Sequence, residues 1–306
     1  MKLIDSSVSL IDIADPFMKI EKAGRTCYKS SSEMTEETAI KFYANLVSRK
    51  HFAMLEHATF CFEVTEHMYH GLYGHKYLNY SVEELDDGSQ RFLISGNLRA
   101  LNESQEDAIL YCLNELNLNL VYRDFNNPLL PSSFFTHHIR LVNIDCVPNI
   151  QEHAYKKHKY LTFHFICDRG VTHEIVRHRP ASYAQESTRY CNYSKDKYGN
   201  EITYIYPADF DNWDSSDRAF FYSALVGAEE SYLALLNRAG KTPQEARAVL
   251  PNALKTEIIM TANCEEFDHF FDLRGRGTTG APHPDMKRVA DMALALYEEN
   301  TKKFIK

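Results

Sequence analysis

The sequence predicts an α+β fold, in which a central mixed or antiparallel sheet is combined with a helical C-terminal half. Two observations support this fold class. Residues 58–64 and 160–167 are rich in aromatic and β-branched side chains with near alternation, which is typical of strands. Residues 215–239 and 285–304 place apolar side chains at helical intervals, so helices dominate this half of the chain.

In the N-terminal half, Thr35 precedes two glutamates and is a typical helix start. The helix that it begins continues with apolar side chains at helical spacing, at Ile40, Tyr43, Leu46 and Val47. Residues 91–95 are expected to form a short strand and residues 103–121 a helix. An irregular stretch rich in Asn, Pro and Ser follows at residues 126–133.

In the C-terminal half, residues 171–176 are expected to be helical and to stop near Arg177, because Pro180 keeps Arg179 out of the helical region. The long helix from Ser215 or Ser216 is expected to end before Gly240, since glycine is typical just past a helix C-terminus. The residues Thr242-Pro243-Gln244-Glu245 then supply a cap, a first-turn proline and a capping glutamate. We therefore expect another helix, with Arg247 inside it.

Composition indicates a globular protein of the cytoplasm. The chain has 306 residues, of which 44% are hydrophobic and 25% charged, and it shows no internal repeat or linker. We expect one domain over residues 1–306. No apolar stretch is long enough to cross a bilayer, and acidic residues interrupt the N-terminal apolar run, which argues against a secretory signal. The net charge of −8 argues against a general nucleic-acid binder, so any basic site is local.

Several weaker patterns are set aside. Seven cysteines at irregular spacing indicate that most are buried thiols in a reducing compartment. His173-Glu174 precedes His178 with one residue too many for a zinc-binding HExxH motif, and no metal is expected. Residues 275–280 fit a dinucleotide glycine pattern but follow a helical segment instead of a strand, which favours a turn between helices.

The segment 177–190, RHRPASYAQESTRY, is the part of the chain most suited to chemistry. Guanidinium groups form two parallel hydrogen bonds to a phosphate or a planar acceptor. Cations at a helix C-terminus can instead simply meet the last carbonyls and the negative end of the dipole. Ser187, Arg189 and Tyr190 add donors that such a helix end does not need. We therefore expect a site for an anionic small molecule.

Three ordered blocks resemble the flavin-dependent thymidylate synthases, and together they are more specific than one motif. The first is RHR, seven residues and then Ser, continued by STRY, at Arg177, His178, Arg179 and Ser187. The second, EARAVLPNALKTEIIMTANCEEFDHFFDLR at 245–274, is similar to the family's Arg-x-x-Leu-Pro, apolar helix, Asn and closing Leu-Arg. The third is Leu55-Glu56-His57, before the first predicted strand.

The resemblance implies a methyltransferase of nucleotide biosynthesis that converts dUMP to dTMP. Methylenetetrahydrofolate would donate the carbon and NADPH-reduced FAD the hydride, in a homotetramer whose active sites are shared between subunits. The residues that would contact the flavin are His57, Arg177, His178, Arg179, Asn263 and His269. Those that would hold dUMP are Gln185, Ser187, Arg189, Arg247 and Arg274, with catalytic roles for Ser187, Arg189 and Arg274.

This chain departs from the family pattern at several positions. Ala184-Gln185 stands where many members have Asn-Glu, His269 stands for an Asn, and residues 281–284 replace Ala-Gln. Gln185 can still hydrogen-bond a nucleotide but cannot accept a proton as a carboxylate would. The stretch at about 67–159 is too long for a structureless connection, so we expect an inserted, folded subregion.

The sequence leaves alternatives open for single residues and for the whole chain. Asn263 can be a helix cap, His57 a core histidine, and Arg247 a solvated helix residue. Cys191 lies near the predicted site, but the family that the chain resembles uses no essential cysteine. The alternative to an enzyme is a non-catalytic flavin- or nucleotide-binding protein on the same scaffold.

Overall fold

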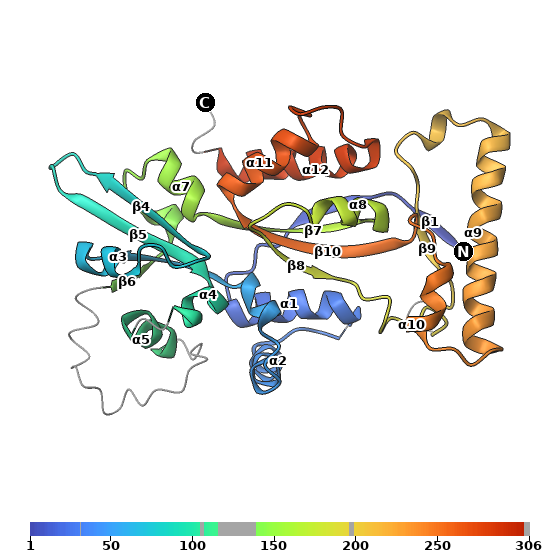
Figure 1. Cartoon of the computed structure of the whole chain (residues 1–306), viewed down its shortest axis with the longest axis horizontal. Helices are drawn as coiled ribbons and strands as arrows, with labels where there is room; N and C mark the ends of the chain where they lie inside the picture. Colours follow the sequence, from blue (N-terminus) through green and yellow to red (C-terminus); the bar gives the residue numbers. More distant parts are fainter. Residues whose placement is uncertain (31, 105–106, 116–138, 196–198, 303–306) are drawn as a thin grey trace.

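The computed structural model describes residues 1–30, 32–104, 107–115, 139–195 and 199–302, and its centre is a four-stranded antiparallel sheet (Figure 1). The strand order is β2 (Ser7–Leu10), β7 (Tyr160–Asp168), β10 (Lys255–Asn263) and β8 (Ser182–Gln185). β10 pairs with β7 along its whole length and with β8 from Ile258 to Thr261. The strand predicted at residues 160–167 is confirmed as β7.

β10 corrects one prediction, because these residues form a strand where the family pattern led us to expect an apolar helix. The strand is buried on both faces: Met260 packs into one apolar cluster and Ile259 into another. A strand buried on both faces has a nearly continuous apolar sequence, which periodicity cannot distinguish from a buried helix.

Helices cover both faces of this sheet (Figure 1). On one face, α8 (Arg169–Ile175), α11 (Cys264–Arg274) and α12 (Pro284–Thr301) share a core with the sheet that includes Phe163, Phe165 and Phe267. On the other face, α1 (Pro16–Tyr28) packs Ala23 against Ala184 and Ile259, and α2 (Glu36–Ser48) packs on α1. Thr35 caps α2 as predicted.

A second antiparallel sheet is built largely from the segment predicted as an insertion. Its strand order is β4 (Leu78–Glu84), β5 (Gln90–Asn97), β3 (Thr59–Val64) and β6 (Ile139–Val142). The helices among the described residues of this part are α3 (Glu66–Leu72), α4 (Leu98–Glu103), α5 (Asp107–Glu115) and α7 (Glu152–His158), with 3-10 turns η1 (Phe52–His57) and η2 (Ile144–Cys146). The strands predicted at 58–64 and 91–95 are thus confirmed.

The helix predicted at 103–121 is wrong at its start, since α4 ends at Glu103 and α5 begins at Asp107. Asn97 caps α4 by accepting a hydrogen bond from the Ala100 amide, so the helical segment begins several residues earlier than predicted. Residues 116–121, and the irregular stretch predicted at 126–133, lie outside the described residues. The single domain over residues 1–306 stays a prediction.

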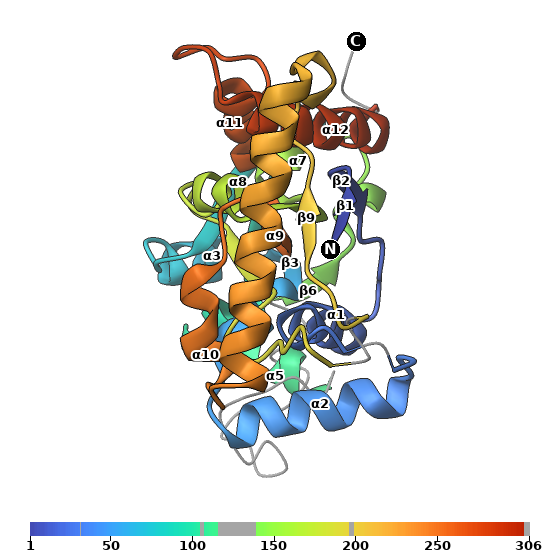
Figure 2. The same cartoon turned by 90° about the vertical axis from the view of Figure 1, so that its right-hand side faces the viewer.

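The opposite end of the molecule holds α9 (Ser215–Asn237), beside the parallel pair β1 (Lys2–Ile4) and β9 (Thr203–Ile205) (Figure 2). The turn η4 (Phe210–Asn212) precedes α9. Gly240 follows α9 with a φ of +65°, as its position past the helix end predicts. No helix in the described part of the chain is long and apolar enough to cross a membrane.

The helix predicted around Arg247 is shorter than expected. Thr242 begins α10 (Pro243–Ala246) with a capping box, but Arg247 already opens the 3-10 turn η5 (Arg247–Val249). Leu250 is extended because Pro251 follows it, so the helical segment cannot continue. The chain then enters β10.

Candidate functional site

His178 and Arg274 form a polar group where the ends of α8 and α11 meet. Arg274 Nε donates a hydrogen bond to His178 Nε2 at 3.0 Å, and the Arg274 guanidinium pairs with Glu174 Oε2 at 2.6 Å. The rings of Phe270 and His178 pack nearly perpendicular to each other, with 4.9 Å between their centroids. A guanidinium has no acceptor, so Nε2 of His178 is unprotonated. Burial, and then the charges of Arg274 and His269, lower the pKa of His178 to about 4.

Arg177 and Arg179 flank this group and are both exposed. Neither guanidinium forms an ion pair or a hydrogen bond with the residues that the structure describes. The backbone around them is fixed by Tyr183, whose hydroxyl lies 2.5 Å from the His178 carbonyl oxygen and 3.0 Å from that of Ile175. α8 ends at Ile175, so the predicted helix stop near Arg177 is confirmed. Two cations are thus presented to solvent from a fixed turn.

Ser187, Arg189 and Arg247 form a second group. The Ser187 amide donates to the Cys27 carbonyl at 3.0 Å, and Ser187 Oγ accepts from the Arg189 amide at 3.3 Å. Arg189 Nε donates to Gln244 Oε1 at 3.0 Å, and an Arg247 nitrogen donates to Thr188 Oγ1 at 3.3 Å. Within the described residues, no carboxylate pairs with either arginine. Their charge is therefore available to an anion.

The two groups lie at opposite ends of β8. Tyr183, which anchors the His178 turn, and Ser187 are four residues apart, about 13 Å of extended chain. Gln185 lies between them, and its side-chain amide donates to Thr172 Oγ1 at 2.8 Å. No hydrogen bond or ion pair links the two groups directly across the described parts of the chain.

His57 and Asn263 are both buried, in agreement with the alternatives of a core histidine and a helix cap that the sequence left open. His57 is fully buried, with Nδ1 2.8 Å from Thr261 Oγ1 and with Nε2 lacking a described partner. Asn263 caps α11 by accepting from the Glu266 amide at 2.9 Å, and its own amide group donates to the Lys157 carbonyl at 3.0 Å. His269, by contrast, is exposed and lies beside His178, with 6.3 Å between the ring centroids.

Sequence reasoning missed the residues that hold these groups in place. Glu174, Gln244 and Thr188 orient Arg274, Arg189 and Arg247, respectively. Glu186, between Gln185 and Ser187, is 2% exposed and bonded at both carboxylate oxygens. The sequence marked Glu186 only by its position inside the RHRPASYAQESTRY segment. Its partner Lys255 lies 69 residues away in the sequence and is brought close by the fold.

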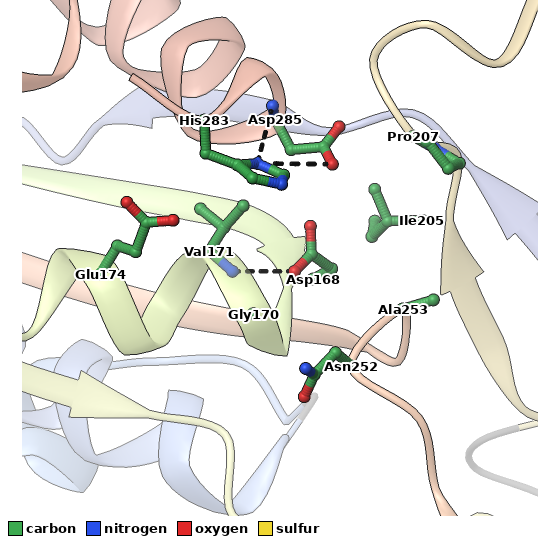
Figure 3. Close-up of a pocket in the computed structure, with 10 residues that line it drawn as sticks. All are labelled: Asp168, Gly170, Val171, Glu174, Ile205, Pro207, Asn252, Ala253, His283 and Asp285. Atoms are coloured by element: carbon green, nitrogen blue, oxygen red, sulfur yellow. Dashed lines mark hydrogen bonds and ion pairs between the residues drawn. The ribbon is translucent and has the colours of Figure 1, made fainter. Parts of the chain in front are cut away.

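A cavity of about 270 Å³ lies between α8 and the start of α12 (Figure 3). Asp168, Glu174, Asp285 and His283 are among its lining residues. Burial, together with the charge of Asp285, raises the pKa of Asp168. The three carboxylates of this lining disfavour the binding of an anionic ligand in the cavity. Glu174 lies at the boundary between this acidic cavity and the cationic group that contains Arg274.

The patterns set aside in the sequence have ordinary places in the fold. Residues 275–280 lie in the connection between α11 and α12, as predicted. Cys191 is fully buried. Among the described residues, no three His, Cys, Asp or Glu side chains are grouped so that they could hold a metal ion.

The fold is of the α+β class, and the arginines of the two groups could each bind an anion. Residues 9–115 and 144–301 match the family described as thymidylate synthase complementing protein, and the chain belongs to this family. Curated relatives named flavin-dependent thymidylate synthase include one from Geobacter sulfurreducens, which is 34% identical over 43% of this chain and 54% of its own length. Another, from Pyrococcus furiosus, is 38% identical over 35% of this chain and 43% of its own length.

The chain thus spans about half the length of the curated relatives it matches. Among solved structures, a UMP/dUMP methylase PolB from Streptomyces cacaoi bound with 5-Br dUMP is 14% identical to this chain. The two structures align with a TM-score of 0.42, over 98% of this chain and 93% of the other.

Proposed function

We propose that this protein is a flavin-dependent thymidylate synthase of the cytoplasm, which converts dUMP to dTMP with methylenetetrahydrofolate as carbon donor. Family membership supports the reaction class. The structural observation that carries the proposal is the exposed cationic surface of Arg177 and Arg179, which has no ion-pair partner among the described residues, beside the fixed pair of His178 and Arg274.

The residues around His178 fit a flavin. Arg177 and Arg179 offer charge to its pyrophosphate or its anionic reduced ring, and the exposed His269 lies next to them. A bound FAD, once reduced by NADPH, would supply the hydride that completes the methyl group. His57 and Asn263 would support the flavin site from the interior of the protein. The His57 ring lies within hydrogen-bond distance of Thr261 in the central sheet, and Asn263 fixes the start of α11.

The residues around Ser187 fit a nucleotide. Arg189 and Arg247 would hold the phosphate, since guanidinium groups bind phosphate oxygens in pairs. Ser187 and Gln185 would hydrogen-bond the base, and Arg274 would stabilise negative charge that develops on the uracil ring. Because the two groups lie at opposite ends of β8, we propose that the complete site combines one group from each of two subunits in a homotetramer.

The reaction is tested by incubating the purified protein with FAD, NADPH, methylenetetrahydrofolate and dUMP and measuring the nucleotide by mass spectrometry. Folate-dependent gain of a methyl group on dUMP is expected, and a reaction without folate is the control. Unchanged dUMP together with bound, reducible flavin would favour the non-catalytic binding protein instead.

Two substitutions should separate the flavin and nucleotide groups. Arg177→Ala removes an exposed cation and is expected to weaken FAD binding about tenfold, the effect of losing one charge-assisted contact. Ser187→Ala is expected to leave FAD bound and to impair turnover of dUMP. FAD binding is read from flavin absorbance after gel filtration, with the exposed Arg49→Ala as control. Full turnover by both variants would contradict the site assignment.

Mixing inactive subunits tests the shared site. Ser187→Ala and Arg274→Ala damage different groups, so a mixed oligomer contains some sites in which both groups are intact. After the two variants are unfolded together and refolded, random assembly should restore about a quarter of the unaltered activity. Mixtures that stay as inactive as the separate variants would place both groups of each site on one chain.

A further inference from the structure

The loop that carries Ser187 and Arg189 is closed by one buried carboxylate. Glu186 begins the loop, and its amide donates to the Glu257 carbonyl at 2.8 Å. Its Oε1 accepts a hydrogen bond from the hydroxyl of Tyr193, at the far end of the loop, at 2.9 Å. Both residues are buried, at 2% and 5% exposure. A single side chain therefore joins the two ends of the loop.

Lys255 holds this carboxylate to the central sheet. Its Nζ lies 2.9 Å from Glu186 Oε2 and also pairs with Glu257, whose other oxygen is 3.0 Å from His164 Nε2. Burial alone would lower the pKa of Lys255, but the two carboxylates raise it, so the ammonium stays charged. Lys255 is the first residue of β10, next to the strand that leads into the loop. The loop is thus tied to the sheet by a buried ion pair.

Inside the loop the backbone turns back on Ser187. The carbonyl of Ser187 accepts from the Tyr190 amide at 3.1 Å and from the Cys191 amide at 2.9 Å. The positions of Ser187 Oγ and of the Arg189 amide beside it follow from this turn. A displacement at either end of the loop would move both groups.

We propose that Glu186, held by Lys255 and Tyr193, is a positioning residue that fixes Ser187 and Arg189 for nucleotide binding. This inference rests on the proposed binding of dUMP. The Glu186 side chain is buried, so it acts on affinity through the loop and not by contact with the nucleotide.

The test compares two buried ion pairs. Glu186→Gln removes the negative charge that pairs with Lys255 and replaces one of the two acceptor oxygens with an amide donor. Glu83→Gln is the matched control, because Glu83 is 1% exposed, pairs with Arg91 at 3.2 Å and accepts the Gln151 amide at 2.6 Å, all in and beside the second sheet. With flavin-loaded protein, Glu186→Gln is expected to raise both the Kd and the KM for dUMP at least tenfold, with kcat changed less. Glu83→Gln should lower Tm without changing the Kd.

A second readout does not depend on the nucleotide. Amide hydrogen exchange at Ser187, Tyr190 and Cys191 should be at least tenfold faster in Glu186→Gln, and it should be faster also in Tyr193→Phe, which keeps the Lys255 pair. Tyr193→Phe decides the question if Glu186→Gln does not fold. Lys255→Arg, which keeps the cation, should retain most of the dUMP affinity.

The outcomes separate this inference from the proposed reaction. An unaltered protein that neither binds nor converts dUMP would refute the reaction, while the exchange rates would still report on the loop. An active protein whose Glu186→Gln and Tyr193→Phe variants keep normal dUMP affinity and exchange would refute the positioning role. If Glu186→Gln and Glu83→Gln lose dUMP affinity equally, Glu186 contributes only to the stability of the fold and does not position the loop.

Discussion

Acidification from pH 7 to pH 4 is expected to lower the free energy of unfolding by several kcal/mol, because three histidines are buried in their neutral form. Burial lowers the pKa of His57 to about 4 and that of His158 to about 3. Burial and then Arg274 lower the pKa of His178 to about 4. In the unfolded chain all three histidines have an ordinary pKa near 6.5.

The sign follows from proton binding. Between pH 6.5 and 4 the unfolded state binds protons at these histidines and the folded state does not, so falling pH favours unfolding. A difference of about 2.5 pKa units corresponds to about 3 kcal/mol for each histidine that stays neutral in the fold. Stability from these groups is complete above pH 6.5 and is lost as the pH falls toward 4.

Buried carboxylates modify this trend at its acid end. Burial alone would raise the pKa of Glu257, but His164 and Lys255 hold it below its usual value, so protonation of Glu257 adds to acid destabilisation. Burial raises the pKa of Asp168 and Glu266, which contribute in the opposite direction. The histidines therefore dominate the range from pH 6.5 to 5, above the titration of ordinary carboxylates.

Urea unfolding at pH 7.5, 6.5, 5.5 and 4.5 measures this dependence. His158 gives the sharpest variant, since its two ring nitrogens lie 2.7 Å from Ser95 Oγ and 2.8 Å from Ser81 Oγ. His158→Gln is expected to reduce the slope between pH 6.5 and 5 by about one proton, or 1.4 kcal/mol per pH unit. His67→Gln, on the exposed side of α3, should leave the slope unchanged. A free energy of unfolding that is constant from pH 7.5 to 5 would contradict the buried, neutral histidines.

Local signals in the sequence predicted the ends of elements well. Thr35 and Thr242 cap helices as expected, and Gly240 follows α9 in a left-handed conformation. These signals work because a cap or a glycine acts on its own neighbours. β10 was not predictable in this way, since a strand in the middle of a sheet is specified by its partners β7 and β8, which lie far away in the sequence.

The candidate site shows the same division. Sequence pattern located Arg177, His178, Ser187 and Arg274, but not which of them meet. The fold joins His178 to Arg274, 96 residues apart, and Lys255 to Glu186, 69 residues apart. Such contacts depend on the order of strands and on the angle at which α11 leaves the sheet. The sequence therefore predicted a set of residues, and the structure divides them into two groups.

Arg274→Ala is expected to reduce kcat/KM for dUMP by at least about a hundredfold, the usual result of removing a donor that stabilises developing charge. Arg274 is placed for this role by Glu174 and His178, which hold two sides of its guanidinium, while its other terminal nitrogen has no hydrogen-bond partner among the described residues. Arg274→Lys keeps the charge but cannot form the two-sided contact, so its loss should be intermediate. Arg276→Ala is the matched control, because Arg276 forms an exposed pair with Asp272 one turn away.

The same variant has a readout on His178 that does not require turnover. Without the neighbouring guanidinium, the pKa of His178 should rise from about 4 toward its ordinary value of 6.5, because one of the two charges that lower it is gone. NMR titration of the ring protons measures this shift, and Arg276→Ala should not reproduce it. A His178 that titrates identically in Arg274→Ala would show that burial alone keeps it neutral. Normal turnover by Arg274→Ala would show that Arg274 is not part of the active site. Lost turnover together with a raised His178 pKa would support both the role of Arg274 and its contact with His178.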